Sequence, residues 1–418
     1  MSAEIPRRRH WWRRIALGLA IVLLGTVGWL LNGMATRYLS GTRQVPGLDW
    51  FGNPVPQDGP TPGFVWFGWT RKSGQPDGLE LVEPSDDGRR YGLRAGDVIE
   101  TVDGRSISSY ADIFKYFMAN CPAGKKVAFQ VHREGRNFDL TVALDPWLRT
   151  PADLGARHED VTIDSRDGLK LRGWYIPPPP GSDGRAGVFA HGAKASRFQG
   201  LRMAEHWLRH GFGLLLMDFS GRGASDGEYV TYGMNERFDL EAMMAWLRAR
   251  PEVDPKKVVY FGTSNGAAAT LLAAADDPLP IAVALDAPYA DLGAVGRETL
   301  ARRGYLGFLI YPLELAVWLK AGLRVSSVRP VEAAVHVRCP VFITHGTADT
   351  SIPPHHTREI LAARQAAGLP TEVWWLPGGE HGFDNYPPMD AYWDRVLKFY
   401  ESVVGPPPSG SQLSGTDS

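Results

Sequence analysis

The chain has 418 residues, and its 45 Lys and Arg residues against 46 Asp and Glu residues leave a formal net charge of −1. This length suggests two or three domains, and 44% hydrophobic with 22% charged residues is ordinary globular usage, so a disulfide-stabilised miniprotein and a wholly disordered protein are excluded. The balanced charge gives no electrostatic footprint for nucleic acid, and two cysteines, Cys121 and Cys339, are too few for a zinc cage or a disulfide framework.

The N-terminal segment combines basic residues with a long apolar run. Five of residues 1–14 are arginines, and residues 15–36 contain no charged side chain. A helix needs about 20 apolar residues to cross a bilayer, so this run is predicted to be a transmembrane signal anchor. Because arginines collect on the cytoplasmic side, residues 1–14 should stay inside and the rest of the chain outside the cytoplasmic membrane, in the periplasm if the cell is bacterial. A cleaved signal peptide is the alternative, since Gly33-Met34-Ala35 is a small-X-small triplet.

A block of short strands is predicted for residues 64–145, after a linker at residues 37–63 that is rich in Gly, Pro and aromatic residues. The strands carry β-branched or alternating apolar residues, and one helical stretch interrupts them. The predicted strands occupy residues 78–82, 98–102 and 127–131, and the helix occupies residues 110–119.

The centre of this block is the stretch 92–105, in which glycines and the pair Asp103-Gly104 force tight turns around a buried Val/Ile strand. The stretch resembles the PDZ domain of bacterial membrane-associated proteins. The resemblance implies that a partner's C-terminal strand adds to an exposed sheet edge, with its carboxylate near Gly68. A β-rich spacer without a peptide ligand is the alternative, because a fold alone does not establish a function.

Strand-like and helical patterns alternate in residues 160–404, after a second linker at residues 146–159. Regular alternation predicts a mostly parallel sheet that helices cover on both faces. The three prolines that open residues 405–418 and the Ser and Gly that follow predict a disordered tail. The predicted strands are residues 161–163, 169–176, 187–190, 213–217, 258–261, 281–285, 341–344 and 372–376, and the helices are residues 201–210, 236–250, 267–275, 355–368 and 389–403.

The pentapeptide Gly262-Thr263-Ser264-Asn265-Gly266 lies between an apolar strand and an Ala-rich helix. A sharp turn that lifts one side chain clear of a sheet leaves no room for a Cβ on either flank, which accounts for the two glycines. This setting favours a nucleophile elbow with Ser264 as the nucleophile. A chance match is the alternative, since the chain has 47 glycines.

A serine nucleophile needs a histidine base and an acid that orients the base. Asp349 follows the predicted strand at residues 341–344, and His381 follows the one at residues 372–376. Active-site groups of open α/β sheets lie at the carboxyl ends of the strands, and the chain order Ser, Asp, His is the one expected for a strand-turn-helix elbow. Ser264, Asp349 and His381 are therefore the predicted catalytic residues.

Acyl transfer also needs preset donors for the oxyanion of the tetrahedral intermediate. One donor should be the backbone N–H of Asn265, directly after the nucleophile. The second should come from the loop His191-Gly192-Ala193, where the N–H of Ala193 is the expected donor and Gly192 lets the backbone approach. His191 is expected to hold this loop in place.

With these motifs, residues 160–404 resemble the α/β-hydrolase superfamily, nearest to its prolyl-oligopeptidase-like and dienelactone-hydrolase-like branch of serine hydrolases. The expected fold class is therefore α/β: an α/β-hydrolase fold preceded by a small PDZ-like domain and an N-terminal transmembrane helix. The resemblance implies catalysis without a metal or an organic cofactor. It also implies a helical cap for the insertion at residues 292–335, whose apolar stretch 306–319 would favour acyl or aromatic substrates near the membrane. Ordinary packing of that stretch against the domain core is the alternative.

The expected function is that of a membrane-anchored serine hydrolase that cleaves an ester or related acyl bond of a small substrate through an acyl-enzyme. A serine peptidase is the runner-up, because a PDZ-like domain could hold the end of a polypeptide. A non-catalytic PDZ scaffold, in which the hydrolase fold only serves as a body, is the third possibility. The triad by itself does not specify the bond that is cleaved.

Overall fold

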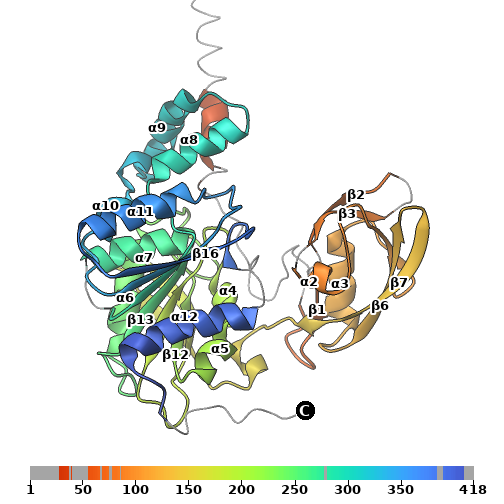
Figure 1. The fold of residues 1–418 in the computed structure, drawn as a ribbon, viewed down its shortest axis with the longest axis horizontal. Helices are drawn as coiled ribbons and strands as arrows, with labels where there is room; N and C mark the ends of the chain where they lie inside the picture. Colours follow the sequence, from red (N-terminus) through yellow and green to blue (C-terminus); the bar gives the residue numbers. More distant parts are fainter. Residues whose placement is uncertain are drawn as a thin grey trace, which may run out of the picture.

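The computed structural model describes residues 28–36, 39, 55–65, 68–74, 78–84, 86–276, 280–383 and 389–408. Figure 1 shows a small β-rich domain beside a larger domain in which helices flank a sheet. Most of the predicted transmembrane run, residues 15–27, lies outside the described residues, as do most of the first linker and most of the tail. Residues 28–36 are helical, and none of the helices in the described part of the chain is both long and apolar enough to span a bilayer.

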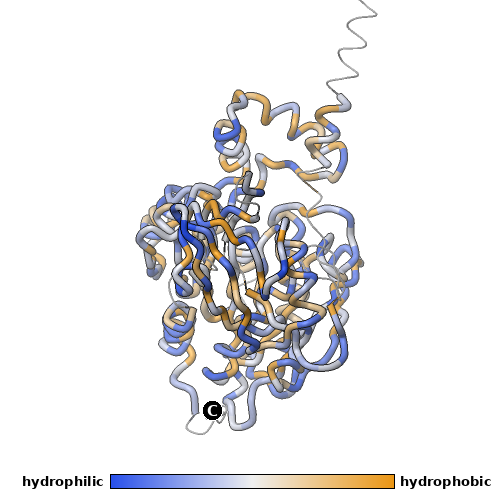
Figure 2. The backbone as a smooth tube through the Cα atoms, turned by 90° about the vertical axis from the view of Figure 1, so that its right-hand side faces the viewer, coloured by the Kyte–Doolittle hydropathy of each residue, from blue (hydrophilic) through white to orange (hydrophobic). Residues whose placement is uncertain are grey.

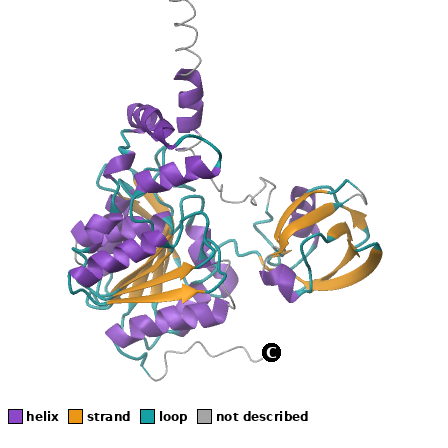
Figure 3. Cartoon of the chain, turned by 45° about the horizontal axis from the view of Figure 1, so that its top comes forward, coloured by secondary structure: helices purple, strands orange, loops and turns teal. Residues whose placement is uncertain are grey.

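The small domain is an antiparallel sheet around one long helix (Figure 3). The predicted strands and helix of this block are confirmed to within a few residues. The sheet order is β2 (Gly68–Lys72), β3 (Leu79–Pro84), β4 (Val98–Val102), β6 (Lys126–Arg133) and β7 (Arg136–Ala143), with β5 (Arg105–Ser106) beside β4, β1 (Gly63–Phe64) paired with β8 (Asp145–Pro146), and the helices α2 (Asp86–Arg90) and α3 (Tyr110–Asn120). Five further strands, β1, β2, β5, β7 and β8, and the short helix α2 were not predicted.

Two tight turns shape this sheet. Asp103 and Gly104 both have positive φ, 49° and 73°, as the predicted Asp-Gly turn between β4 and β5 requires. Glu134 and Gly135, with φ of 50° and 78°, make the same kind of turn between β6 and β7. The strand β7 escapes sequence analysis because most of its side chains are exposed or half-buried, so its hydrophobic signal is weak.

The larger domain contains an eight-stranded sheet in the order β16-β15-β14-β13-β11-β12-β10-β9. The six strands β11 to β16 are mutually parallel. The strand β10 runs antiparallel to both of its neighbours, β12 and β9. The predicted mostly parallel sheet is therefore confirmed. The strands are β9 (Glu159–Asp164), β10 (Lys170–Ile176), β11 (Ala186–Ala190), β12 (Gly213–Met217), β13 (Val258–Thr263), β14 (Val283–Asp286), β15 (Val341–Gly346) and β16 (Thr371–Leu376).

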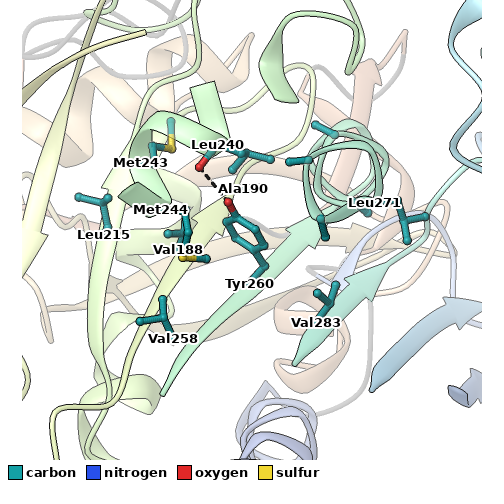
Figure 4. Close-up of a cluster of buried hydrophobic side chains, with 14 of the residues drawn as sticks. Val188, Ala190, Leu215, Leu240, Met243, Met244, Val258, Tyr260, Leu271 and Val283 are labelled. Carbon is teal, nitrogen blue, oxygen red and sulfur yellow. Dashed lines mark hydrogen bonds between the residues drawn. The ribbon is translucent and has the colours of Figure 1, made fainter. Parts of the chain in front are cut away.

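Each central strand contributes side chains to two hydrophobic cores, one on each face of the sheet, because alternate side chains of a strand point to opposite faces. In β13, Val258 and Tyr260 belong to one core, and Val259 and Phe261 to the other. Figure 4 shows the first core around Tyr260, whose phenol donates a hydrogen bond of 2.8 Å to the carbonyl of Leu240. Helices that cover the first core are α6 (Glu236–Arg248), α7 (Asn265–Asp276), α10 (Pro330–Ala334) and α11 (His355–Ala366); those that cover the second are α4 (Arg197–Leu201), α5 (Ala204–Arg209) and α12 (Met389–Val404).

One helix prediction was wrong in its extent. The helix expected at residues 201–210 is the shorter α5 (residues 204–209), and residue 201 is the last residue of a separate short helix, α4, which was not predicted. Gly200 explains the tight approach of α4 to the sheet, since a Cβ there would lie 2.5 Å from Leu216 and 2.8 Å from Phe189. This contact joins residues that are far apart in the sequence, so the sequence pattern around Gly200 does not predict it.

The insertion after β14 forms a helical cap at one end of the sheet (Figure 1). Its helices are α8 (Leu292–Arg302) and α9 (Ile310–Ala321), followed by α10. Ile310, Leu313 and Val317 point into a core that the cap shares with Ala35 of the N-terminal helix. The expected packing against the domain core therefore holds for one side of α9 only.

Candidate active site

Ser264 lies at the turn between β13 and α7, with a positive φ of 53°. This backbone conformation is costly for a residue with a Cβ and is typical of a nucleophile elbow. The two flanking glycines are sterically required. A Cβ on Gly262 would lie 2.6 Å from the carbonyl oxygen of Gly266, and one on Gly266 would lie 2.1 Å from that of Ala190.

The structure brings the three predicted catalytic side chains together from three loops. Nε2 of His381 lies 3.0 Å from Oγ of Ser264, and Nδ1 of His381 lies 2.7 Å from Oδ2 of Asp349. An ionised carboxylate can only accept, so Nδ1 carries the proton and Nε2 is left to accept the hydrogen of the serine hydroxyl. The geometry is that of a nucleophile, its base and an orienting acid.

Asp349 is buried and surrounded by donors. Its Oδ1 accepts hydrogen bonds from the backbone N–H groups of Ser351 and Ile352, at 2.8 and 2.9 Å. Burial alone would raise the pKa of Asp349, but hydrogen bonds from His345 and His381 outweigh it and hold this pKa below its usual value. Asp349 is therefore ionised at neutral pH.

The interaction between His381 and Asp349 raises the pKa of His381, whereas it lowers the pKa of Asp349. Burial of His381 lowers its pKa, but the hydrogen bond and the negative charge of Asp349 outweigh burial and raise the pKa above the ordinary 6.5. An imidazole that a buried carboxylate orients and makes more basic suits proton transfer from a hydroxyl.

The loop that follows β11 lies beside the nucleophile. A Cβ on Gly192 would be 3.8 Å from the Cβ of Ser264, and the N–H of Gly192 is held by Oε1 of Gln199 at 3.0 Å. Ala193 follows directly on this loop. Asn265 is the first residue of α7, so its N–H has no acceptor within the helix and sits where the helix dipole favours negative charge. Of the two predicted oxyanion donors, Asn265 directly follows Ser264, and Ala193 lies on the loop whose Gly192 approaches Ser264.

His191 has the holding role that the sequence predicts. It is buried, its Nε2 accepts the N–H of Phe219 at 3.0 Å, and its Nδ1 lies 2.8 Å from the carbonyl oxygen of Gly192. Burial lowers its pKa to about 4, so the ring is neutral near pH 7. The imidazole of His191 therefore links the loop after β11, which carries Gly192 and Ala193, to the loop after β12, which carries Phe219.

Two site residues were missed by sequence reasoning. Asp286 is fully buried at the end of β14, where it accepts hydrogen bonds from Thr263 at 2.8 Å and from the backbone N–H of Phe383 at 3.0 Å. Its position at the carboxyl end of a strand was an available signal. His345 is also buried, and its ring lies 2.7 Å from the hydroxyl of Thr357 and 3.4 Å from Asp349. Both residues position loops that carry the triad.

Among the described residues, one group could in principle share a metal ion: Glu298, His355 and His356. The two histidine Nε2 atoms lie 3.1 and 3.3 Å from the Glu298 carboxylate. However, Nδ1 of His356 accepts the N–H of Ala290 at 3.3 Å, which leaves the proton on Nε2. A protonated nitrogen donates a hydrogen bond to the carboxylate and is not a ligand, so the geometry is that of a hydrogen-bonded group.

Two family models match this sequence. The prolyl oligopeptidase family matches residues 204–406, and the PDZ domain matches residues 79–144. An uncharacterized protein of Mycobacterium tuberculosis is 30% identical over 225 residues, which are 53% of this chain and 72% of the relative.

Solved structures show the same fold. An esterase of Pyrococcus furiosus superposes with a TM-score of 0.51 at 24% identity, over 61% of this chain and 95% of the esterase. A puromycin-hydrolyzing peptidase of Mycobacterium tuberculosis superposes with a TM-score of 0.50 at 20% identity, over 68% of this chain and 45% of the peptidase. An esterase and a peptidase match about equally well, so the likeness does not distinguish the two reactions.

Proposed function

This chain belongs to the α/β-hydrolase superfamily of serine hydrolases, with a prolyl-oligopeptidase-like region and a PDZ domain, and we propose that it hydrolyses esters through Ser264, His381 and Asp349. The observation that carries this proposal is the continuous hydrogen-bonded path from the Ser264 hydroxyl through both ring nitrogens of His381 to a buried carboxylate. A merely structural serine would not need a strained turn or a polarised imidazole.

The proposed reaction proceeds in two halves. Oγ of Ser264 attacks the carbonyl carbon while Nε2 of His381 takes its proton, and Asp349 stabilises the resulting imidazolium. The backbone N–H groups of Asn265 and Ala193 meet the negative oxygen of the tetrahedral intermediate. His381 then gives its proton to the leaving alcohol as the C–O bond breaks. In the second half, a water molecule gives its proton to His381 as it attacks the acyl-enzyme, and His381 returns that proton to Oγ of Ser264 as the bond to the acyl group breaks and the acid leaves.

We favour an ester over a peptide bond because of what surrounds the sheet. Among the described residues, the larger domain adds only the helical cap, and its α9 is rich in apolar side chains. The described residues of this domain include no propeller or second peptide-docking module, and a small acyl substrate needs neither.

A peptidase remains the second candidate because of one feature of the PDZ domain. In the described sheet β2 pairs with β3 on one side only, so its other side is an edge to which an extended peptide could add. A polypeptide end bound there would be held on the same chain as the nucleophile. The membrane anchor at residues 15–36 and an extracytoplasmic position of both domains complete the proposal, on the strength of the arginine-rich flank and the uncharged run.

A fluorophosphonate probe tests the proposal directly. We expect it to label the wild-type chain and not Ser264→Ala, and we expect turnover of short-chain p-nitrophenyl esters to exceed turnover of peptide p-nitroanilides. Turnover of the anilides alone would favour the peptidase. A folded wild-type chain that neither labels nor turns over any acyl substrate would instead support the non-catalytic scaffold.

A further inference from the structure

Large apolar side chains are exposed together on the cap and on the helix of residues 28–36. Figure 2 shows hydrophobic stretches along the chain in this region, at the top of the view. Monomeric soluble proteins rarely expose a contiguous apolar surface of this kind without a partner. We call this surface the cap face, and its residues are Trp29, Leu30, Tyr305, Leu306, Phe308, Tyr311, Leu315, Trp318 and Leu319.

The helix α9 is apolar on both of its sides. Its inner side packs into the cap through Ile310, Leu313 and Val317, at the spacing of a buried helix face. Its outer side carries side chains that are exposed by 67% at Tyr311 and 72% at Leu319. A helix that is hydrophobic all round is normally enclosed on all sides by protein or lies in a membrane.

The two charged residues of α9 do not make its outer side polar. The carboxylate of Glu314 accepts hydrogen bonds from the backbone N–H and the hydroxyl of Ser326, at 2.8 and 2.6 Å. The ammonium group of Lys320 donates to the hydroxyl of Thr36 at 2.8 Å and approaches the side-chain oxygen of Asn32 at 3.4 Å. Glu314 is thus engaged within the cap, and Lys320 is engaged by the N-terminal helix.

The cap face is continuous with the predicted membrane span. Ala35 and Leu39 are fully buried in the cap core, and Lys320 ties the same helix to α9. The helix is described from Gly28, and the residues that precede it in the sequence, 15–27, are uncharged and mostly apolar. A bilayer that accepts the uncharged run of residues 15–36, of which residues 28–36 belong to this helix, would therefore lie next to the cap face.

The cap also carries an excess of positive charge. Residues 292–335 contain six Lys and Arg residues (Arg297, Arg302, Arg303, Lys320, Arg324 and Arg329) and three Glu residues (Glu298, Glu314 and Glu332), a balance of +3 in a chain whose net charge is −1. Lys320 is engaged by Thr36, and Arg329 pairs with Asp291 and Glu332, so the attraction to anionic lipid headgroups would come from the other basic residues.

We propose that the cap face docks into the headgroup region of the membrane and that lipids are its partner. Its apolar side chains enter the boundary between headgroups and acyl chains, while the aromatic rings of Tyr311 and Trp318 take the interfacial position that such rings prefer. The inference builds on the proposed anchor and adds a second contact to it. The α/β domain is then held against the bilayer in one orientation and does not hang from a flexible tether.

The test uses the full chain in vesicles of phosphatidylcholine and phosphatidylglycerol. A polarity-sensitive fluorophore is attached to Leu315→Cys on the cap face and, as a matched control, to Val82→Cys on the PDZ domain, two apolar residues with 54% and 49% exposure. The unsubstituted chain, which has Cys121 and Cys339, supplies the background labelling. Fluorophosphonate labelling of each variant checks that the α/β domain is folded, and Leu319→Cys repeats the measurement at a second position.

We expect spin-labelled lipid to quench the Leu315→Cys probe at least threefold more strongly than the Val82→Cys probe, and aqueous iodide to show the reverse order. Equal quenching at the two positions in chains that float with the vesicles would overturn the docking proposal but leave the anchor intact. A chain that does not float with the vesicles would overturn both. Excimer emission from pyrene at position 315, without quenching by lipid, would show that a second copy covers the cap face and would also overturn the proposal.

Discussion

The α/β domain and the PDZ domain have separate hydrophobic cores, but their candidate sites are built differently. In the α/β domain, the site consists of side chains at the ends of three strands, joined by hydrogen bonds of 3.0 and 2.7 Å. In the PDZ domain, the candidate surface is the backbone edge of β2, which would be recognised by main-chain hydrogen bonds. A single substitution can therefore abolish the first site, whereas the second depends on the sheet as a whole.

The largest expected effect is that of Ser264→Ala. Removal of the nucleophile should lower kcat/KM for an ester by about 10⁴-fold or more, as loss of a triad member does in serine hydrolases. The thermal unfolding transition should stay unchanged, because only one hydroxyl is removed, and peptide binding by the PDZ domain should not respond. Residual activity above a few per cent of wild type would place the nucleophile elsewhere.

Asp349→Asn comes next, with an expected loss of about 10³- to 10⁴-fold in kcat/KM. The amide oxygen can still accept the N–H groups of Ser351 and Ile352, but the side chain no longer stabilises a charged His381. Asp103→Asn is the matched control, since Asp103 is a PDZ carboxylate that accepts the N–H of Ala128 at 2.8 Å. That control should leave ester hydrolysis within about twofold, and an equal loss in both variants would contradict the assigned role.

Substitutions in the two hydrophobic cores should show that the two domains unfold independently. Phe114 in the PDZ core and Trp393 in the α/β core are both fully buried, so either change to Ala should cost about 3–5 kcal/mol in the free energy of unfolding of its own domain. Denaturant unfolding, followed by ester hydrolysis for the α/β domain, gives the readout. Phe114→Ala should leave hydrolysis unchanged at low denaturant; a parallel loss of activity would mean that the two domains unfold together.

The smallest effect is a shift in the pH profile. Because the base must be unprotonated, kcat/KM should fall tenfold per pH unit below the pKa of His381 in the free enzyme. Asp349 raises that pKa, so the midpoint of the acid limb should lie above pH 6.5. The wild-type profile measures this midpoint directly. A midpoint below 6.5 would show that burial outweighs the carboxylate.

Much of the site could be predicted because it depends on local chemistry. The glycines around Ser264 are needed by the turn itself, and Asp349 and His381 follow strands whose hydrophobic runs are plain in the sequence. The residues that support them were missed for the opposite reason. Asp286 and His345 matter through contacts with segments far away in the chain, such as the N–H of Phe383, and no local pattern marks such partners.

The fold shows the same division. The strands β11 to β15 of the α/β sheet were predicted because their apolar runs are buried on both faces. The strand β7 was not, since its side chains are largely exposed, and neither was the short helix α4, whose Gly200 lies close to the distant residues Phe189 and Leu216. Only those features that leave a mark in neighbouring residues could be predicted from them.

By itself, the sequence determined the order of the domains, the alternation of strands and helices, and the identity of the three reactive side chains, because periodicity and turn chemistry act over a few residues. Only the tertiary structure decided that an imidazole 117 residues from Ser264 lies 3.0 Å from its hydroxyl. It also decided that the outer side of α9 faces away from the domain core. Both outcomes depend on packing between distant segments, whose free energy is not encoded in any one stretch of the chain.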